Sequence, residues 1–177
     1  MSILDQLKQY LYRSVIEQRR QLLAPHRIVN MAQAASIGII YDSTPPSNDI
    51  VIAKFAEALR NKGKKVEVFA FLNDKKTDRK ADVEIFNRNA VNWYGIPTDE
   101  KVSQFCKKKF DLLLCAYNQP SPPLEYIAMF SQAQYRVGCF HEQKTKCYDL
   151  MIQTGSNTDL QYLLQRMLIT LDSIQTK

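Results

Sequence analysis

Two short polar segments are the best candidates for chemistry in this chain, because each follows an apolar run and precedes a helix-like pattern. The first is Asp42-Ser43-Thr44, after "SIGIIY", and the second is Tyr117-Asn118-Gln119, after "DLLLCA". In open parallel sheets, ligands bind beyond the carboxyl ends of the strands, where such segments lie. If the two strands are neighbours, one crevice collects five candidate ligand-binding residues: Asp42, Ser43, Thr44, Asn118 and Gln119.

Neither segment carries a phosphate-binding or catalytic motif. The first has Pro45-Pro46 where a phosphate loop has glycines, and proline lacks the N–H group that binds an anion. Asn118 and Gln119 can hydrogen-bond a polar ligand, but they cannot act as general bases near neutral pH. The favoured interpretation is that both segments are connectors, in which Asp42 shapes its turn. A small-ligand site is the alternative.

Metal and nucleophile chemistry finds little support. His26 and His141 are the only histidines, and the spacing of Cys139, His141 and Cys147 matches no common zinc pattern. We therefore predict no metal, no cofactor and no catalytic residue. No C-x-x-C pair occurs, which favours free thiols in a reducing cytoplasm. The aromatic pair Trp93-Tyr94 has the chemistry to stack on a base or sugar, but core or interface packing is the favoured interpretation.

Composition indicates a globular protein. The chain has 177 residues, of which 45% are hydrophobic and 24% charged, as in ordinary folded domains. It shows no secretory signal and no stretch of about 18 apolar residues, so we predict a cytoplasmic protein without a transmembrane segment. We expect an N-terminal amphipathic helix and linker over residues 1–31, followed by one domain over residues 32–177.

The net charge of +6 is unevenly spread. Residues 60–80 contain eight basic and three acidic residues, a local net charge of +5, and residues 107–109 are three lysines. Such a segment can bind a polyanion, although a solvated surface is the favoured interpretation. The candidate polyanion-binding residues are those of its second half: Lys75, Lys76, Arg79 and Lys80.

The N-terminal segment reads as an amphipathic helix from Ile3 to about Leu23, where Pro25 ends it. Its apolar residues recur at helical spacing, and the opposite side carries basic residues. We favour packing of this helix on its own domain. Binding to a protein partner or a membrane surface is the alternative.

Strand-like and helix-like segments alternate along the rest of the chain. Strands are predicted over 36–41, 65–71, 90–94, 111–116, 135–140 and 148–153, while 82–89 is ambiguous. Helices are predicted after Ser47 or Asn48 as the N-cap, over 99–108, after Ser121, and from 155 onward. This alternation predicts an α/β fold, a three-layer sandwich with a mostly parallel, Rossmann-like sheet. The apolar run Leu112-Leu113-Leu114 predicts a central, fully covered strand.

Four stretches resemble an uncharacterised bacterial family of small single-domain proteins. They are "AASIGIIYDST" from Ala34, "VNWYGIP" from Val91, "FDLLLCAYNQPSPPLEYIAMFSQAQYRVGCF" from Phe110, and "YDLMIQ" from Tyr148. The resemblance covers most of the chain from about Leu7 onward. It implies a Rossmann-like fold and brings no established activity with it.

A more distant resemblance links the chain to the N-terminal half of heptosyltransferases that act on lipopolysaccharide. Asp111 and Arg136-Val137-Gly138 match the pattern of those enzymes, but Cys115-Ala116-Tyr117 replaces a second acidic position. In those enzymes the nucleotide-sugar site lies chiefly in a second Rossmann-like domain, for which this chain leaves no room. The resemblance therefore transfers no catalytic residue.

Three functional hypotheses follow. The favoured one is a non-catalytic binding or regulatory module on a Rossmann-like scaffold. The second is a glycosyltransferase-like half-enzyme that needs a partner chain. The third is a basic protein associated with RNA or ribosomes, although no known RNA-binding motif is present. The fold alone does not choose among them.

Overall fold

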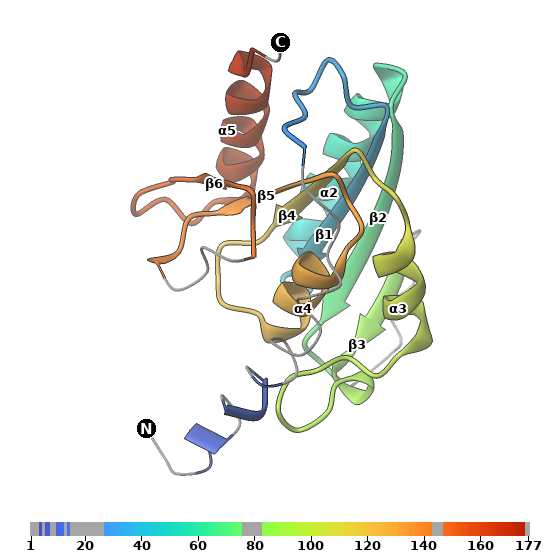
Figure 1. The fold of residues 1–177 in the computed structure, drawn as a ribbon, viewed down its shortest axis with the longest axis vertical. Helices are drawn as coiled ribbons and strands as arrows, with labels where there is room; N and C mark the ends of the chain where they lie inside the picture. Colours follow the sequence, from blue (N-terminus) through green and yellow to red (C-terminus); the bar gives the residue numbers. More distant parts are fainter. Residues whose placement is uncertain are drawn as a thin grey trace.

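The computed structural model describes residues 4, 6, 7, 10–12, 14, 27–75, 83–142 and 147–175. Within this part of the chain, six strands form one parallel sheet in the spatial order β3-β2-β1-β4-β5-β6 (Figure 1). The strands are β1 Ser36–Asp42, β2 Lys65–Leu72, β3 Glu84–Asn87, β4 Leu112–Ala116, β5 Tyr135–Cys139 and β6 Leu150–Ile152. The predicted α/β sandwich with a Rossmann-like parallel sheet is confirmed.

Helices cover both faces of this sheet. The elements are α2 Pro46–Asn61, α3 Glu100–Lys107, α4 Pro122–Phe130 and α5 Leu160–Ser173, with a short 3-10 helix, η1, at Arg88–Ala90. One hydrophobic cluster joins α2 and α5 to one face, and a second joins α3 and α4 to the other. The chain therefore forms three layers with a core on each side of the sheet.

The central strands contribute side chains alternately to the two cores. Leu112 and Leu114 belong to the cluster with α2 and α5, while Leu113 and Cys115 belong to the cluster with α3 and α4. This follows from the two-residue period of a strand. All residues of β4 are buried, and Leu113 is fully buried. The predicted central position of this strand is confirmed.

The strand order reverses direction between β1 and β4. The chain passes from β1 outward to β2 and β3, then returns through α3 to place β4 on the other side of β1. Loops that follow β1 and β4 therefore leave the same edge of the sheet and diverge, which is where doubly wound α/β proteins bind ligands. We expected the strands that precede the two polar segments to be neighbours in the sheet, and the pairing of β1 with β4 confirms this.

Two local predictions are wrong. The third strand covers Glu84–Asn87 and not 90–94, where η1 and an irregular loop follow. Helix α2 begins at Pro46 with Pro45 as its N-cap, two or three residues before the predicted N-cap at Ser47 or Asn48. Proline is well suited to the first helical turn because its missing N–H group has no partner there in any case.

The N-terminal helix prediction lies largely outside the described residues. Those that the structure describes between positions 4 and 14 are helical. Leu4 and Leu7 are exposed, so the expected packing of the apolar face is not seen for these two side chains. Tyr12 packs differently, because its hydroxyl group donates a hydrogen bond to the carbonyl oxygen of Pro122 at 3.0 Å.

Candidate functional site

A cavity of about 460 Å³ opens at the carboxyl edge of the sheet. Its walls come from residues that follow β1, β2 and β3, from the loop after η1, and from the loop between β4 and α4. Its volume suits a small organic ligand. The cavity therefore occupies the region in which a fold of this strand order binds ligands.

The segment after β1 contributes one side chain to the cavity and uses the others to hold its shape. Asp42 lines the cavity, and its Oδ1 accepts a hydrogen bond from the Thr44 N–H at 2.8 Å. Thr44 Oγ1 accepts from the Asn73 N–H at 3.0 Å, which joins this loop to the end of β2. Ser43 is fully buried and donates to Asp49 at 2.6 Å. The connector interpretation thus fits Ser43 and Thr44.

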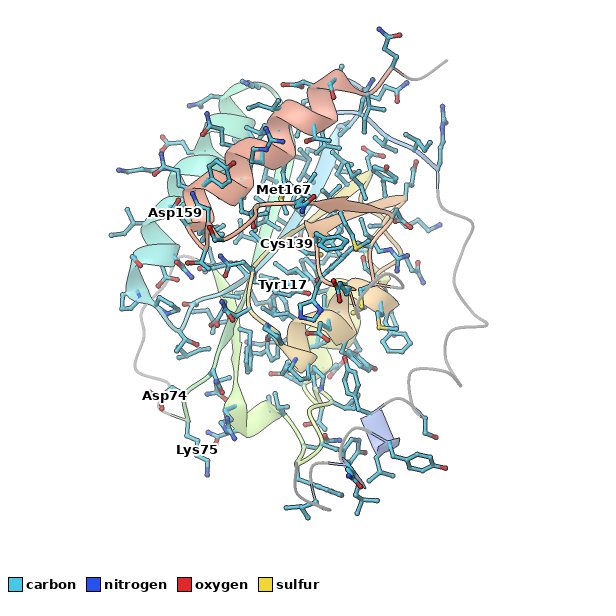
Figure 2. All side chains as sticks on the ribbon, turned by 90° about the vertical axis from the view of Figure 1, so that its left-hand side faces the viewer. Asp74, Lys75, Tyr117, Cys139, Asp159 and Met167 are labelled. Atoms are coloured by element: carbon cyan, nitrogen blue, oxygen red, sulfur yellow. The ribbon has the colours of Figure 1, made fainter. Side chains whose placement is uncertain are left out.

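The cationic side of the cavity lies at the ends of β2 and β3. The Arg88 guanidinium donates to Asn73 Oδ1 at 2.9 Å, and both residues line the cavity. Lys75 also lines it, and its carbonyl oxygen accepts from the Asn89 amide at 3.0 Å. Figure 2 shows Lys75 near the end of the molecule at which these strands finish. These hydrogen bonds therefore hold the guanidinium of Arg88 and the backbone of Lys75 in place.

A tight loop after η1 builds the next wall. Val91 and Pro97 form an isolated antiparallel bridge that closes the loop. Inside it, Asn92 Oδ1 accepts from the Ile96 N–H at 2.8 Å, and the Asn92 carbonyl accepts from the Gly95 N–H at 3.0 Å. Gly95 has φ +99, a conformation that other residues rarely adopt. The bridge and the hydrogen bonds within the loop fix its conformation, although it pairs with no strand of the sheet.

Trp93 lies at the tip of this loop and lines the cavity. Its side chain is 55% exposed, and its ring meets Tyr94 edge to face with centroids 5.3 Å apart. Of the two kinds of packing that we favoured, core packing is therefore wrong for Trp93, and interface packing stays a prediction. An exposed indole on the wall of a polar cavity offers a flat apolar surface to a ligand.

The loop between β4 and α4 supplies the last wall, but not through the two amides predicted to bind. Pro120, Ser121, Pro122 and Pro123 line the cavity. Asn118 lies outside its lining and donates a hydrogen bond to the Thr158 carbonyl oxygen, just before α5. It therefore links two loops, which is a connecting role. Gln119 is exposed and also lies outside the lining.

The cavity thus contains one of the five predicted ligand residues, Asp42. Arg88 and Asn73 were missed, because the strand before Arg88 was assigned wrongly and the loop that carries Asn73 was not placed at this edge. Trp93 was named as a possible stacking residue, but packing was the favoured interpretation. Lys75, a candidate polyanion-binding residue, also lines the cavity. The other three residues of that prediction, Lys76, Arg79 and Lys80, lie outside the described residues.

The residues that resemble the heptosyltransferase pattern hold the fold together at the opposite, amino edge of the sheet. Asp111 Oδ2 accepts hydrogen bonds from the Ala35 and Ser36 N–H groups at 2.9 and 2.8 Å, which ties the start of β4 to the start of β1. Burial acts to raise the pKa of Asp111. The hydrogen bonds outweigh burial, so its pKa lies below the ordinary value.

Arg136 and Gly138, in β5, have equally structural partners. The buried Arg136 forms an ion pair with Asp149 at 3.1 Å, and its guanidinium also donates to the Ala128 carbonyl oxygen. Gly138 leaves room for the ring of Tyr148, since a Cβ there would lie 2.5 Å from a ring carbon. This part of the resemblance therefore reflects packing and not a site.

Several other titratable side chains, tyrosines and cysteines, are buried in the core. The Tyr148 hydroxyl donates to the Tyr117 hydroxyl at 2.8 Å, and burial raises the pKa of both phenols well above its ordinary value. Of the four cysteines, Cys106, Cys115 and Cys147 are buried and Cys139 is partly exposed, all as free thiols. The described residues contain no cluster of three side chains suited to a metal ion. No helix among them is long and apolar enough to cross a membrane.

Strand order and cavity together define a Rossmann-like α/β protein with a polar cavity at the point where the strand order reverses. The chain belongs to DUF6913, a family of unknown function, whose profile matches residues 7–174. This confirms the resemblance to an uncharacterised family. No curated protein matches the chain.

Proposed function

We propose that this protein is a binding module for a small polar ligand, which it holds in the cavity at the carboxyl edge of the sheet. The observation that carries the proposal is the convergence of Asp42, Arg88 and Trp93 on one cavity from three separate segments. A few polar groups on an otherwise fixed surface are typical of ligand sites.

Binding without catalysis fits the chemistry of the lining. Asp42 is the only carboxylate among the described lining residues, and no histidine or cysteine is among them. Its Oδ1 already accepts a backbone hydrogen bond, which favours a role in holding a hydroxyl or amine over one in proton transfer. A regulatory role, in which ligand binding changes contacts with a partner chain, would use the same cavity.

A thermal-shift screen against small polar metabolites tests the proposal, because a ligand that binds the folded state raises the melting temperature by mass action. Any hit should lose its effect in Trp93→Ala. Phe140→Ala is the matched control, since Phe140 is an exposed aromatic side chain outside the cavity. A hit whose effect survives Trp93→Ala and Asp42→Ala would place the ligand elsewhere and contradict the proposal.

A further inference from the structure

The cavity has an excess of positive charge. Lys75 and Arg88 lie in its lining together with one carboxylate, Asp42. The Arg88 guanidinium is anchored through Asn73, whereas the Asn89 side-chain amide holds only the backbone carbonyl of Lys75. Because the anchored guanidinium loses little side-chain freedom on binding, and Lys75 adds a second positive charge beside it, the pair favours an anionic group on the ligand.

The helix N-termini at the same edge are poorly suited to that anion. In most doubly wound folds the free N–H groups of the first helical turn bind phosphate. Here α2 begins with Pro45 and Pro46, and α4 begins with Pro122 and Pro123, none of which has an N–H group. The Ser121 N–H is also occupied, because it donates to Glu125 Oε1 at 2.9 Å.

The lining also offers surfaces for the uncharged part of a ligand. The indole of Trp93 presents a flat face of the kind on which bases stack. Asp42 can accept hydrogen bonds from ligand hydroxyl groups, as acidic residues do for ribose in related folds. An anion, a ring and hydroxyl groups are thus each matched by one part of the cavity wall.

We infer that the ligand is a small phosphate ester carrying a planar ring, of the nucleoside monophosphate type, whose phosphate is held by the side chains of Arg88 and Lys75 and not by a helix N-terminus. This inference rests on the proposed function. In other doubly wound folds the anion binds at the first helical turns, whereas here we place it at the ends of β2 and β3. The ring of the ligand would stack on Trp93.

Calorimetric titration with AMP, UMP, adenosine, uridine and inorganic phosphate tests the inference. We expect each monophosphate to bind at least about tenfold more tightly than its nucleoside, because hydrogen bonds to charged groups contribute more than neutral ones. Arg88→Gln and Lys75→Gln should each reduce that preference and leave nucleoside binding nearly unchanged. Trp93→Ala should weaken monophosphate and nucleoside alike, by about tenfold.

One control tests whether the effect is specific to the cavity, and a second tests whether each variant folds. Lys101→Gln removes an exposed cation of α3 that lies outside the lining, and it should bind like the original protein. Thermal unfolding without ligand shows whether each variant folds. Lys75→Gln matters here, because it removes a charge without removing the Arg88–Asn73 hydrogen bond.

The outcomes separate the two proposals. Nucleosides that bind as tightly as their monophosphates would overturn the phosphate inference and leave a polar binding module in place. A charge preference that survives both Arg88→Gln and Lys75→Gln would also overturn it. If neither these compounds nor the metabolite screen yields a ligand, the inference and the proposed function both fail.

Discussion

Individual side chains at the centre of the sheet should dominate stability. Leu113 is fully buried in β4, with α3 and α4 packed over it. Leu113→Ala should therefore lower the free energy of unfolding by about 2–5 kcal/mol, through lost burial and an unfilled cavity. Urea denaturation measures this. Leu4→Ala, at an exposed position, is the control and should change stability little.

Asp111 should make stability depend on pH. Its folded-state pKa is below the ordinary value of 3.8, because hydrogen bonds from Ser36 and Ala35 outweigh the effect of burial. A lowered pKa stabilises the folded state above the unfolded pKa, and this contribution is lost as pH falls through the folded pKa. Asp111→Asn should therefore be less stable than the original protein at pH 7, and the gap should narrow below about pH 4.

Denaturation at a series of pH values between 7 and 3 gives the measurement. If the original protein and Asp111→Asn lose stability in parallel over that range, the lowered pKa of Asp111 is wrong. Asparagine keeps one acceptor oxygen for the Ala35 and Ser36 N–H groups, so most of the pH dependence of the difference comes from the charge.

At the residue scale, the sequence allowed only part of the site to be predicted. Asp42 was found because it ends a strand with a strong apolar signal. Arg88 was not found, and Trp93 was named only as a possible stacking residue without a place. Their position beside Asp42 depends on β3 lying at the edge beside β2, and strand order cannot be read from local residue patterns. Asn118 and Gln119 were named as candidates but lie outside the cavity lining, because the directions of their side chains depend on a turn stiffened by prolines.

Among the elements, α5 should be the one that the sheet needs most. Its buried residues pack beside α2 on the same face, over β4 and β6; they are Leu160, Leu163, Leu164, Met167 and Leu171. Removing all residues after Gly155 should expose that face and give an aggregated or molten protein. Gel filtration and near-ultraviolet circular dichroism measure the effect. Removing only residues 176 and 177 is the control.

A truncated protein that stays monodisperse and unfolds cooperatively would show that α5 serves a partner and not the sheet. The prediction of this helix succeeded because its apolar stripe is long and begins at an acidic N-cap, Asp159. The third strand failed for the opposite reason. The four residues Glu84–Asn87 are too few to show a period, and a charged segment precedes them.

For the molecule as a whole, the described basic residues of the 60–80 segment lie at two opposite edges of the sheet. Arg60, Lys62 and Lys65 lie near the start of β2, together with the lysines at 107–109 that approach β4. Lys108 forms an ion pair with Glu67 of β2, which shows that these two segments meet. Lys75 lies beyond the other end of β2, about 26 Å away along its eight residues.

Two sets of charges this far apart should act independently, because the distance exceeds the screening length of about 8 Å at physiological salt. We predict salt-sensitive retention on heparin to which both edges contribute additively. One variant replaces Lys62, Lys65, Lys107 and Lys109 by glutamine, and the other replaces Lys75 and Arg88. Elution salt should fall in each and fall further in the combination. Retention lost entirely in one variant would reveal a single polyanion site.

The prolines that begin α2 and α4 have a consequence for how fast a ligand binds. Each fixes its own φ near −65° and restricts the residue before it, so the walls at Pro45-Pro46 and Pro122-Pro123 have few conformations to lose. A rim that is already ordered adds little entropy loss on association. For the proposed ligand, these two walls should therefore not slow association. Differences in affinity among related ligands should come mainly from their dissociation rate constants.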